Sequence, residues 1–134
     1  MKIKLGIIGF GGMGKWHSQN APRAGVEIAA VCDIKPERQQ EAVDAGFKMY
    51  KTADELLADP DVNTVILTVP NYLHHDMCLK AAAAGKNVIT EKPAAMNVQE
   101  LDEMEDACRK AGVFFTSHQN RRWDKDMLTV KKAY

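Results

Sequence analysis

The sequence has few cysteines, few aromatic side chains and no excess of charge of either sign. Its three cysteines, Cys32, Cys78 and Cys108, are far apart and odd in number, which fits neither a disulfide framework nor a cysteine-based zinc site. The 18 basic residues balance 18 acidic ones. Domains that bind nucleic acids usually carry a basic excess that neutralises phosphates, so no nucleic-acid partner is expected.

Long hydrophobic runs are also missing. No stretch approaches the ~20 apolar residues of a membrane span, and the apolar residues before Gly9 are fewer than a signal peptide needs. We therefore expect a cytoplasmic protein with reduced thiols and no membrane partner. What the sequence does have is 134 residues, 46% of them hydrophobic, which is enough for one compact domain with its own core.

Short runs rich in β-branched residues alternate with longer stretches of helical period. The runs are almost continuously apolar, as is typical of parallel strands that helices cover on both faces. The pattern predicts an α/β fold with a doubly wound parallel sheet of about six strands. The predicted strands are Lys4 to Ile8, Ile28 to Cys32, Lys48 to Tyr50, Thr64 to Val69, Asn87 to Thr90 and Val113 to Ser117.

Capping residues mark several helices between these strands. Asn97 with Glu100, and Thr52 with Glu55, have the spacing of capping boxes at helix starts. Proline favours the first turn of a helix, and glycine favours the position just after its end. Further helices are therefore predicted from Pro36 to about Ala45 and from Leu73 to Ala84.

A glycine-rich loop follows the first predicted strand. Its residues are Gly9, Phe10, Gly11, Gly12, Met13 and Gly14, a G-x-G-x-x-G sequence that opens a helix. In a Rossmann-type fold, the first glycine makes a tight turn, the second lets the backbone approach a pyrophosphate, and the third allows close packing of helix on strand. The helix N-terminus then offers N–H groups to the phosphates. The alternative is an ordinary glycine-rich turn.

An acidic residue, Asp33, ends the second predicted strand. It follows Gly14 at close to the ~20-residue spacing of the carboxylate that binds the adenosine ribose in NAD-dependent folds. A carboxylate there would repel a 2′-phosphate, which favours NAD over NADP, although Lys35 lies nearby. The alternative role for Asp33 is to cap the helix that begins at Pro36, and the two roles are compatible.

Three further polar clusters follow the predicted strands. They are Pro70-Asn71-Tyr72-Leu73-His74-His75, Glu91-Lys92-Pro93 and His118-Gln119-Asn120-Arg121-Arg122-Trp123-Asp124. In a doubly wound sheet, ligands bind at the carboxyl ends of the strands. We therefore expect these clusters to border the same ligand as the glycine-rich loop.

These motifs together resemble the Gfo/Idh/MocA family of nicotinamide-dependent oxidoreductases (glucose-fructose oxidoreductase, inositol dehydrogenase, rhizopine catabolism). The resemblance rests on GFGGMG at 9–14, TVPNYLHHD at 68–76, AGKNVITEKP at 84–93 and HQNRRWD at 118–124, with Asp33 between the first two. It covers nearly the whole chain. It implies hydride transfer between NAD(P) and a sugar, cyclitol or related polyol by an enzyme that is usually a homo-oligomer.

The resemblance also implies roles for individual residues. Pro70, Asn71 and His74 would border the cofactor, and Glu91 would hydrogen-bond near the nicotinamide ribose. Lys92 would be the catalytic residue, binding the substrate oxygen and assisting its proton transfer. An ammonium group there would stabilise developing alkoxide charge. The alternative for Lys92 is a solvated side chain before a proline turn.

Other polar residues invite plainer interpretations. His75 directly follows His74, and adjacent helical residues face different directions, so no metal site is expected and His75 is predicted to be solvated. Trp16 and His17 are expected to pack rather than touch the cofactor. Arg121, Arg122, Trp123 and His118 are assigned no catalytic role, because in the family they mark the crossing into a second domain.

The resulting domain assignment is an NAD(P)-binding Rossmann domain at 1–123, with 124–134 starting the connection to a C-terminal substrate domain. Such a chain is expected to bind NAD without efficient turnover of its own. Two alternatives from other classes stay open at this point. One is a non-catalytic NAD-sensing regulatory module, which would not need Glu91-Lys92-Pro93. The other is a protein-interaction domain with a vestigial loop, which would bind no cofactor.

Overall fold

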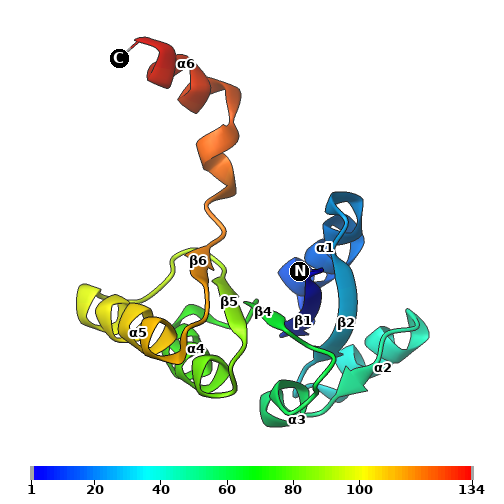
Figure 1. Ribbon diagram of the computed structural model, residues 1–134. Helices are drawn as coiled ribbons and strands as arrows, with labels where there is room; N and C mark the ends of the chain where they lie inside the picture. The colour runs from blue at the N-terminus through cyan, green and yellow to red at the C-terminus, as the bar shows by residue number, and fades with distance from the viewer. Residues whose placement is uncertain (1, 134) are drawn as a thin grey trace.

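One six-stranded sheet forms the centre of the fold in the computed structural model, which describes residues 2–133. The strand order is β3-β2-β1-β4-β5-β6 and every neighbouring pair is parallel, so the predicted doubly wound sheet is confirmed (Figure 1). The strands are β1 (Lys4–Ile8), β2 (Glu27–Cys32), β3 (Met49–Tyr50), β4 (Thr64–Leu67), β5 (Asn87–Thr90) and β6 (Phe115–Ser117).

Helices connect the strands. The α-helices are α1 (Gly12–Asn20), α2 (Pro36–Asp44), α3 (Ala53–Leu57), α4 (His74–Ala83), α5 (Val98–Ala111) and α6 (Lys125–Ala133). Short 3₁₀ turns are η1 (Ala21–Ala24), η2 (Asn71–Leu73) and η3 (Asn120–Trp123). The predicted caps are present: Asn97 accepts a hydrogen bond from the Glu100 N–H, and Thr52 and Glu55 form a reciprocal capping box.

The fourth strand is shorter than the sequence suggested. Thr68 still donates its backbone N–H to the Ile8 carbonyl, but β4 ends at Leu67. The chain then turns at Pro70, and the Val69 carbonyl lies 3.1 Å from His74 Nε2 instead of joining the sheet. The expected strand residues Thr68 and Val69 therefore line the edge of the sheet where a ligand would bind.

The two faces of the sheet carry separate hydrophobic clusters. Along β4, Val65 and Leu67 pack with the cluster that includes Met104 of α5, whereas Ile66 packs with Phe10 on the other face. Both faces are covered, which explains why the central strands are apolar at every position rather than at alternate ones. The three cysteines are buried, as expected for small core residues.

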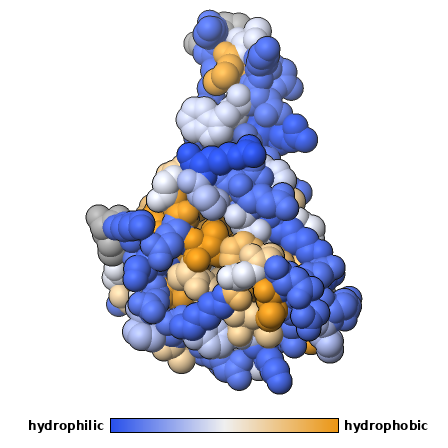
Figure 2. Space-filling model, turned by 90° about the vertical axis from the view of Figure 1, so that its right-hand side faces the viewer, coloured by the Kyte–Doolittle hydropathy of each residue, from blue (hydrophilic) through white to orange (hydrophobic). Residues whose placement is uncertain are grey.

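The C-terminal helix stands apart from this body. In Figure 1, α6 follows η3 away from the sheet, and Figure 2 shows the same segment as a projection above a face with a hydrophobic area. Within residues 2–133, no helix is both long enough and apolar enough to cross a membrane. The proposed boundary at residues 123 and 124 stays a prediction.

Candidate cofactor-binding site

The glycine-rich loop joins β1 to α1 at the carboxyl edge of the sheet. Gly9 has φ +97°, a conformation that side chains disfavour, and Thr68 Oγ1 donates to the Gly9 carbonyl. A Cβ on Gly14 would lie 2.1 Å from Gly9 O, so the loop closes only with glycine at position 14. These two glycines fix the shape of the loop.

The start of α1 is open to an anion. No side chain of the described part of the chain caps this end of the helix, and its first turn contains no acidic residue. The first N–H groups of a helix have no partner within it and carry partial positive charge. At Gly12, an added Cβ would meet no atom within 4 Å. The loop therefore offers free N–H donors and room beside them, which fits the pyrophosphate of a dinucleotide.

Asp33 is buried next to this loop. Its Oδ2 accepts the Phe10 N–H at 2.7 Å and its Oδ1 accepts the Lys35 N–H at 2.9 Å. The alternative role as a helix cap is not observed, because Lys35 is the N-cap residue of α2 and no side chain within residues 2–133 caps that helix. Arg38 adds an ion pair, with its Nη1 3.3 Å from Asp33 Oδ2. Asp33 thus ties the end of β2 to the glycine-rich loop.

A cavity of about 440 Å³ begins beside Asp33. Its lining comes from the ends of β1, β2 and β4 and includes Gly9, Ile34, Arg38, Thr68, Val69, Pro70 and Tyr72. It combines apolar walls with two carboxylates, Asp33 and Asp54, and several cationic side chains. This composition and position fit the adenosine half of NAD, with its base against apolar side chains and its ribose near Asp33.

The first polar cluster divides between surface and interior. Pro70 and Asn71 are exposed, as a cofactor contact requires, and Pro70 lines the cavity. His74 is fully buried, with Nδ1 3.0 Å from the Pro93 carbonyl and Nε2 3.1 Å from the Val69 carbonyl. His74 therefore joins the ends of β4 and β5. Direct contact of Pro70, Asn71 or His74 with a cofactor stays a prediction.

Glu91, at the end of β5, lies among aromatic side chains on the α1 side of the sheet. Its Oε1 is 2.6 Å from His17 Nε2 and 3.0 Å from His118 Nδ1. The two imidazole rings meet edge to face at 4.8 Å, and Trp16 packs against both of them. The expected packing of His17 is present, but it includes a hydrogen bond that the sequence did not indicate.

The protonation of this cluster follows from its burial and contacts. Burial alone would raise the pKa of Glu91, but the hydrogen bond from His17 and the neighbouring His118 outweigh it and hold the pKa below its usual value. Burial lowers the pKa of His17, and the hydrogen bond to Glu91 only partly offsets that effect. Glu91 is therefore a carboxylate at neutral pH, and a neutral His17 donates its Nε2–H.

Lys92 follows this buried carboxylate and is exposed. Its backbone N–H lies 3.4 Å from Glu91 Oε2, and the Lys92-Pro93 peptide bond is cis. The turn is thus held on one side by the Glu91 N–H, which donates to the Leu67 carbonyl, and on the other by His74, which contacts the Pro93 carbonyl. A catalytic role for Lys92 fits this fixed position at the carboxyl edge and remains a proposal.

The remaining histidine is on the surface side of α4. Its side chain is partly exposed, and its Nε2 lies 2.7 Å from Glu103 of α5. His75 is therefore paired with a carboxylate rather than simply solvated. The atoms of His17, Glu91 and His118 that could hold a metal ion lie within 4.8 Å of one another. Two of their separations are those of hydrogen bonds, so the cluster is satisfied without an ion. The absence of a metal stays a prediction.

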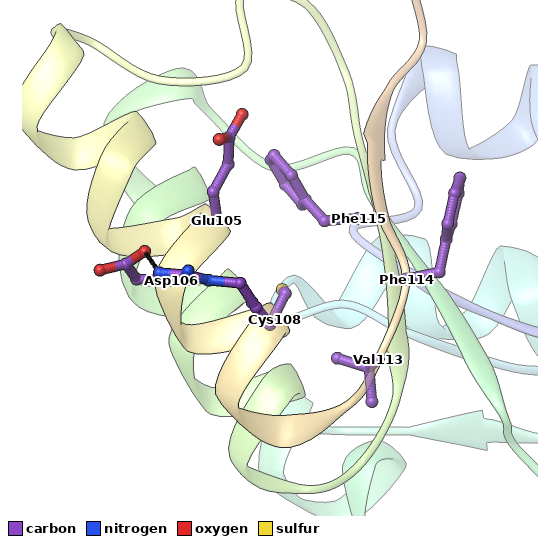
Figure 3. A pocket seen from close by; sticks show the side chains of 7 residues that line it. Glu105, Asp106, Cys108, Val113, Phe114 and Phe115 are labelled. Carbon is purple, nitrogen blue, oxygen red and sulfur yellow. Dashed lines mark hydrogen bonds and ion pairs between the residues drawn. The ribbon is translucent and has the colours of Figure 1, made fainter.

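A larger cavity, of about 590 Å³, lies elsewhere (Figure 3). It lies between the last turns of α5 and the start of β6. Phe115 points toward Glu105, and Phe114 lies on the opposite side of the strand. Asp106 pairs with Arg109 at its rim. Because it faces the amino end of β6, this cavity lies away from the strand ends that carry the glycine-rich loop.

Residues 3–119 match the family described as the oxidoreductase family with an NAD-binding Rossmann fold, Gfo/Idh/MocA. The chain belongs to this family. It is 36% identical over 133 residues to the uncharacterized oxidoreductase YrbE of Bacillus subtilis, covering 97% of this chain and 39% of that protein. It is 31% identical over 134 residues to myo-inositol 2-dehydrogenase of Thermotoga maritima, covering 98% and 40%.

Solved structures of similar proteins agree with the fold. The NAD-binding protein of Listeria innocua has a TM-score of 0.94 at 38% identity. The WlbA dehydrogenase of Bordetella pertussis, in complex with NADH and UDP-GlcNAcA, has a TM-score of 0.93 at 31% identity. Both comparisons cover 98% of this chain and 40% of the other, so the chain spans about 40% of these relatives' length. The expected family is confirmed, and nothing supports the regulatory alternative.

Proposed function

We propose that the carboxyl edge of this sheet binds NAD. The chain would be the cofactor-binding domain of a longer protein, a dehydrogenase that acts on a sugar, cyclitol or related polyol. The observation that carries this is the uncapped start of α1, which follows a loop that is hydrogen-bonded to Asp33 through the Phe10 N–H. The named relatives include a myo-inositol 2-dehydrogenase and a dehydrogenase holding NADH, which supports the cofactor and the substrate class.

The roles of the binding residues follow from their positions. The N–H groups of Gly11, Gly12 and Met13 would face the pyrophosphate, with Gly9 and Gly14 shaping the loop. Asp33 would accept hydrogen bonds from the adenosine ribose hydroxyls. Bound NAD supplies a hydride acceptor or donor.

Lys92 would act on the substrate oxygen. Its ammonium group would stabilise negative charge that develops on this oxygen, and its Nζ would take up or return the hydroxyl proton. The backbone on both sides of Lys92 is anchored, by the Glu91 N–H that donates to the Leu67 carbonyl before it and by the Pro93 carbonyl after it. Anchoring of this kind keeps a catalytic side chain in register with a bound cofactor.

The substrate, assembly and location belong to the same proposal. A polyol would be oxidised at one CH–OH group, and the longer protein would be a cytoplasmic homo-oligomer, as the family resemblance implies.

Fluorescence titration of the 134-residue chain with NADH tests the binding proposal. Saturable enhancement or quenching of nicotinamide fluorescence is expected. A flat titration would contradict it and favour an interaction domain with a vestigial loop.

A further inference from the structure

The cluster of His17, Glu91 and His118 joins three elements that are far apart in the sequence. His17 is on α1, Glu91 follows β5 and His118 follows β6. Glu91 is 6% exposed and His17 is 6% exposed, so the contact between them is shielded from water. The proposed reaction uses neither histidine, which raises the question of what they do.

We propose that His17 and His118 are positioning residues, which fix the Glu91 carboxylate so that its second oxygen faces the nicotinamide half of the cofactor. This inference rests on the proposed function that the chain binds NAD. The two histidines would therefore strengthen binding of the nicotinamide half of the cofactor and leave binding of the adenosine half unchanged.

The hydrogen bonds support this division between the two carboxylate oxygens. Oε1 of Glu91 accepts from both imidazoles, at 2.6 and 3.0 Å. Among residues 2–133, Oε2 has only the Lys92 N–H, at 3.4 Å, which is a weak contact. A carboxylate oxygen can accept two hydrogen bonds, so Oε2 keeps capacity for a hydroxyl donor from a ligand.

The position of Glu91 points to the nicotinamide end. The Glu91 N–H donates to the Leu67 carbonyl, so Glu91 stands directly beside the end of β4. Asp33, which marks the adenosine end, stands beyond β1 at the end of β2, two strands from β4 in the sheet. A dinucleotide that starts at Asp33 and passes over the glycine-rich loop therefore reaches Glu91 with its second ribose.

The energetic advantage of the histidines is preorganisation. A glutamate side chain has three rotatable bonds, and ordering them during binding lowers affinity. Two imidazole donors order them beforehand and keep the carboxylate ionised, as its lowered pKa indicates. Trp16 packs on both rings and restrains the histidines in turn.

The test compares two nucleotides with the same 134-residue chain. NADH has both riboses, whereas ADP lacks the nicotinamide ribose. In the His17→Leu and His118→Leu variants, we expect NADH affinity to fall about tenfold, as for loss of hydrogen bonds to a charged group, while ADP affinity stays within about twofold.

Conservative variants distinguish positioning from a general structural role. His17→Gln keeps an N–H near the place of Nε2, and His118→Asn keeps one near the place of Nδ1, so both should restore most of the NADH affinity. His75→Gln, on the surface side of α4, is the matched control and should change neither affinity. Two-bond ¹H–¹⁵N imidazole spectra should show the proton of His17 on Nε2 and that of His118 on Nδ1.

Each other outcome has a defined meaning. Unchanged NADH affinity in both leucine variants, or an equal loss for NADH and ADP, overturns the positioning role. If a leucine variant does not fold, the imidazole spectra and the glutamine and asparagine variants decide instead: the opposite tautomers, or NADH affinity not retained, overturn it. If the unaltered chain binds neither nucleotide, the proposed function fails and the positioning role fails with it.

Discussion

His17 Nε2 lies 2.6 Å from Glu91 Oε1, and this contact joins the helix after the glycine-rich loop to the strand end that precedes Lys92. The pair is separated by 74 residues in the sequence. It links the loop that is proposed to bind phosphate to the turn that is proposed to act in catalysis, because α1 starts at the loop and β5 ends just before Lys92. A change in the pair should therefore be visible at the Lys92 turn, where the nicotinamide half of the cofactor is proposed to lie.

The first prediction concerns pH and stability. Burial lowers the pKa of His17 in the folded chain below its ordinary value of 6.5, so the unfolded chain takes up the proton more readily as the pH falls. The contribution of His17 to the free energy of unfolding is complete above pH 6.5. It decreases as the pH falls through the lowered pKa of the folded chain. Denaturant unfolding of the wild type and His17→Gln between pH 7.5 and 5 measures it.

We expect the wild type to lose more of its free energy of unfolding than His17→Gln over this range. His75 has a raised pKa, so its contribution to stability increases as the pH falls. Because both proteins contain His75, this contribution cancels when their pH profiles are compared. Parallel pH profiles for the two proteins would contradict the assignment of a neutral, buried His17.

The second prediction concerns the glycine-rich loop. Gly14→Ala should remove NADH binding, because the new Cβ would lie 2.1 Å from Gly9 O and force the loop open. Gly12→Ala is the matched control, since its Cβ would meet no atom within 4 Å and alanine favours helix. NADH titration of both variants checks this. Equal affinities would show that the loop shape does not determine binding.

The third prediction concerns Asp33. Asp33→Ala should lose about 1.5 to 3 kcal/mol of NADH affinity, the range for hydrogen bonds to a charged group. Wild type should bind NADPH more weakly than NADH, because the carboxylate repels a 2′-phosphate, and the variant should narrow that difference. Fluorescence titrations with both nucleotides measure it. An unchanged NADH dissociation constant would refute the assignment.

The fourth prediction concerns Lys92. In a longer protein that contains this chain and has dehydrogenase activity, Lys92→Ala should lower turnover by about 10² to 10⁴, as expected for a general acid–base group. NADH binding should persist, because Lys92 is exposed and is not among the residues proposed to hold the cofactor. Steady-state kinetics beside NADH titration separates the two effects. Near-normal turnover would exclude the catalytic role.

The fifth prediction concerns a buried hydroxyl. Within residues 2–133, Thr90 Oγ1 is buried with no hydrogen-bond partner. Burying such a group without a partner is unfavourable, so Thr90→Val should leave the free energy of unfolding unchanged or raise it by up to about 1 kcal/mol. Urea unfolding measures the difference. A clear loss of stability would show that the hydroxyl makes a contact absent from this structure.

Much of the fold could be predicted because its signals are local. The apolar runs gave all six strands within a few residues, and Asn97 with Glu100 and Thr52 with Glu55 gave two helix starts. The end of β4 was misplaced by two residues. Val69 is as apolar as its neighbours, and only its contact with His74 shows that the chain has left the sheet there.

The candidate site was predictable where one segment forms it and less so where distant segments meet. The glycine-rich loop and Asp33 have a recognisable spacing, but the contact of His17 with Glu91 depends on how α1 lies against β5. A partial signal existed: Gly14, His17 and Ser18 are spaced as one helix face, and all three are buried. The ion pair between Asp33 and Arg38, in the first turn of α2, was not predicted from the sequence.

The most direct measurement of the central proposal is a ¹H–¹⁵N correlation spectrum of the 134-residue chain titrated with NAD. Saturable shifts are expected in the amides of Gly9 to Gly14, of Asp33 and of the Glu91-Lys92 turn, with the α5–β6 cavity unaffected. Shifts confined to residues 105–115, or no shifts at millimolar NAD, would contradict the account.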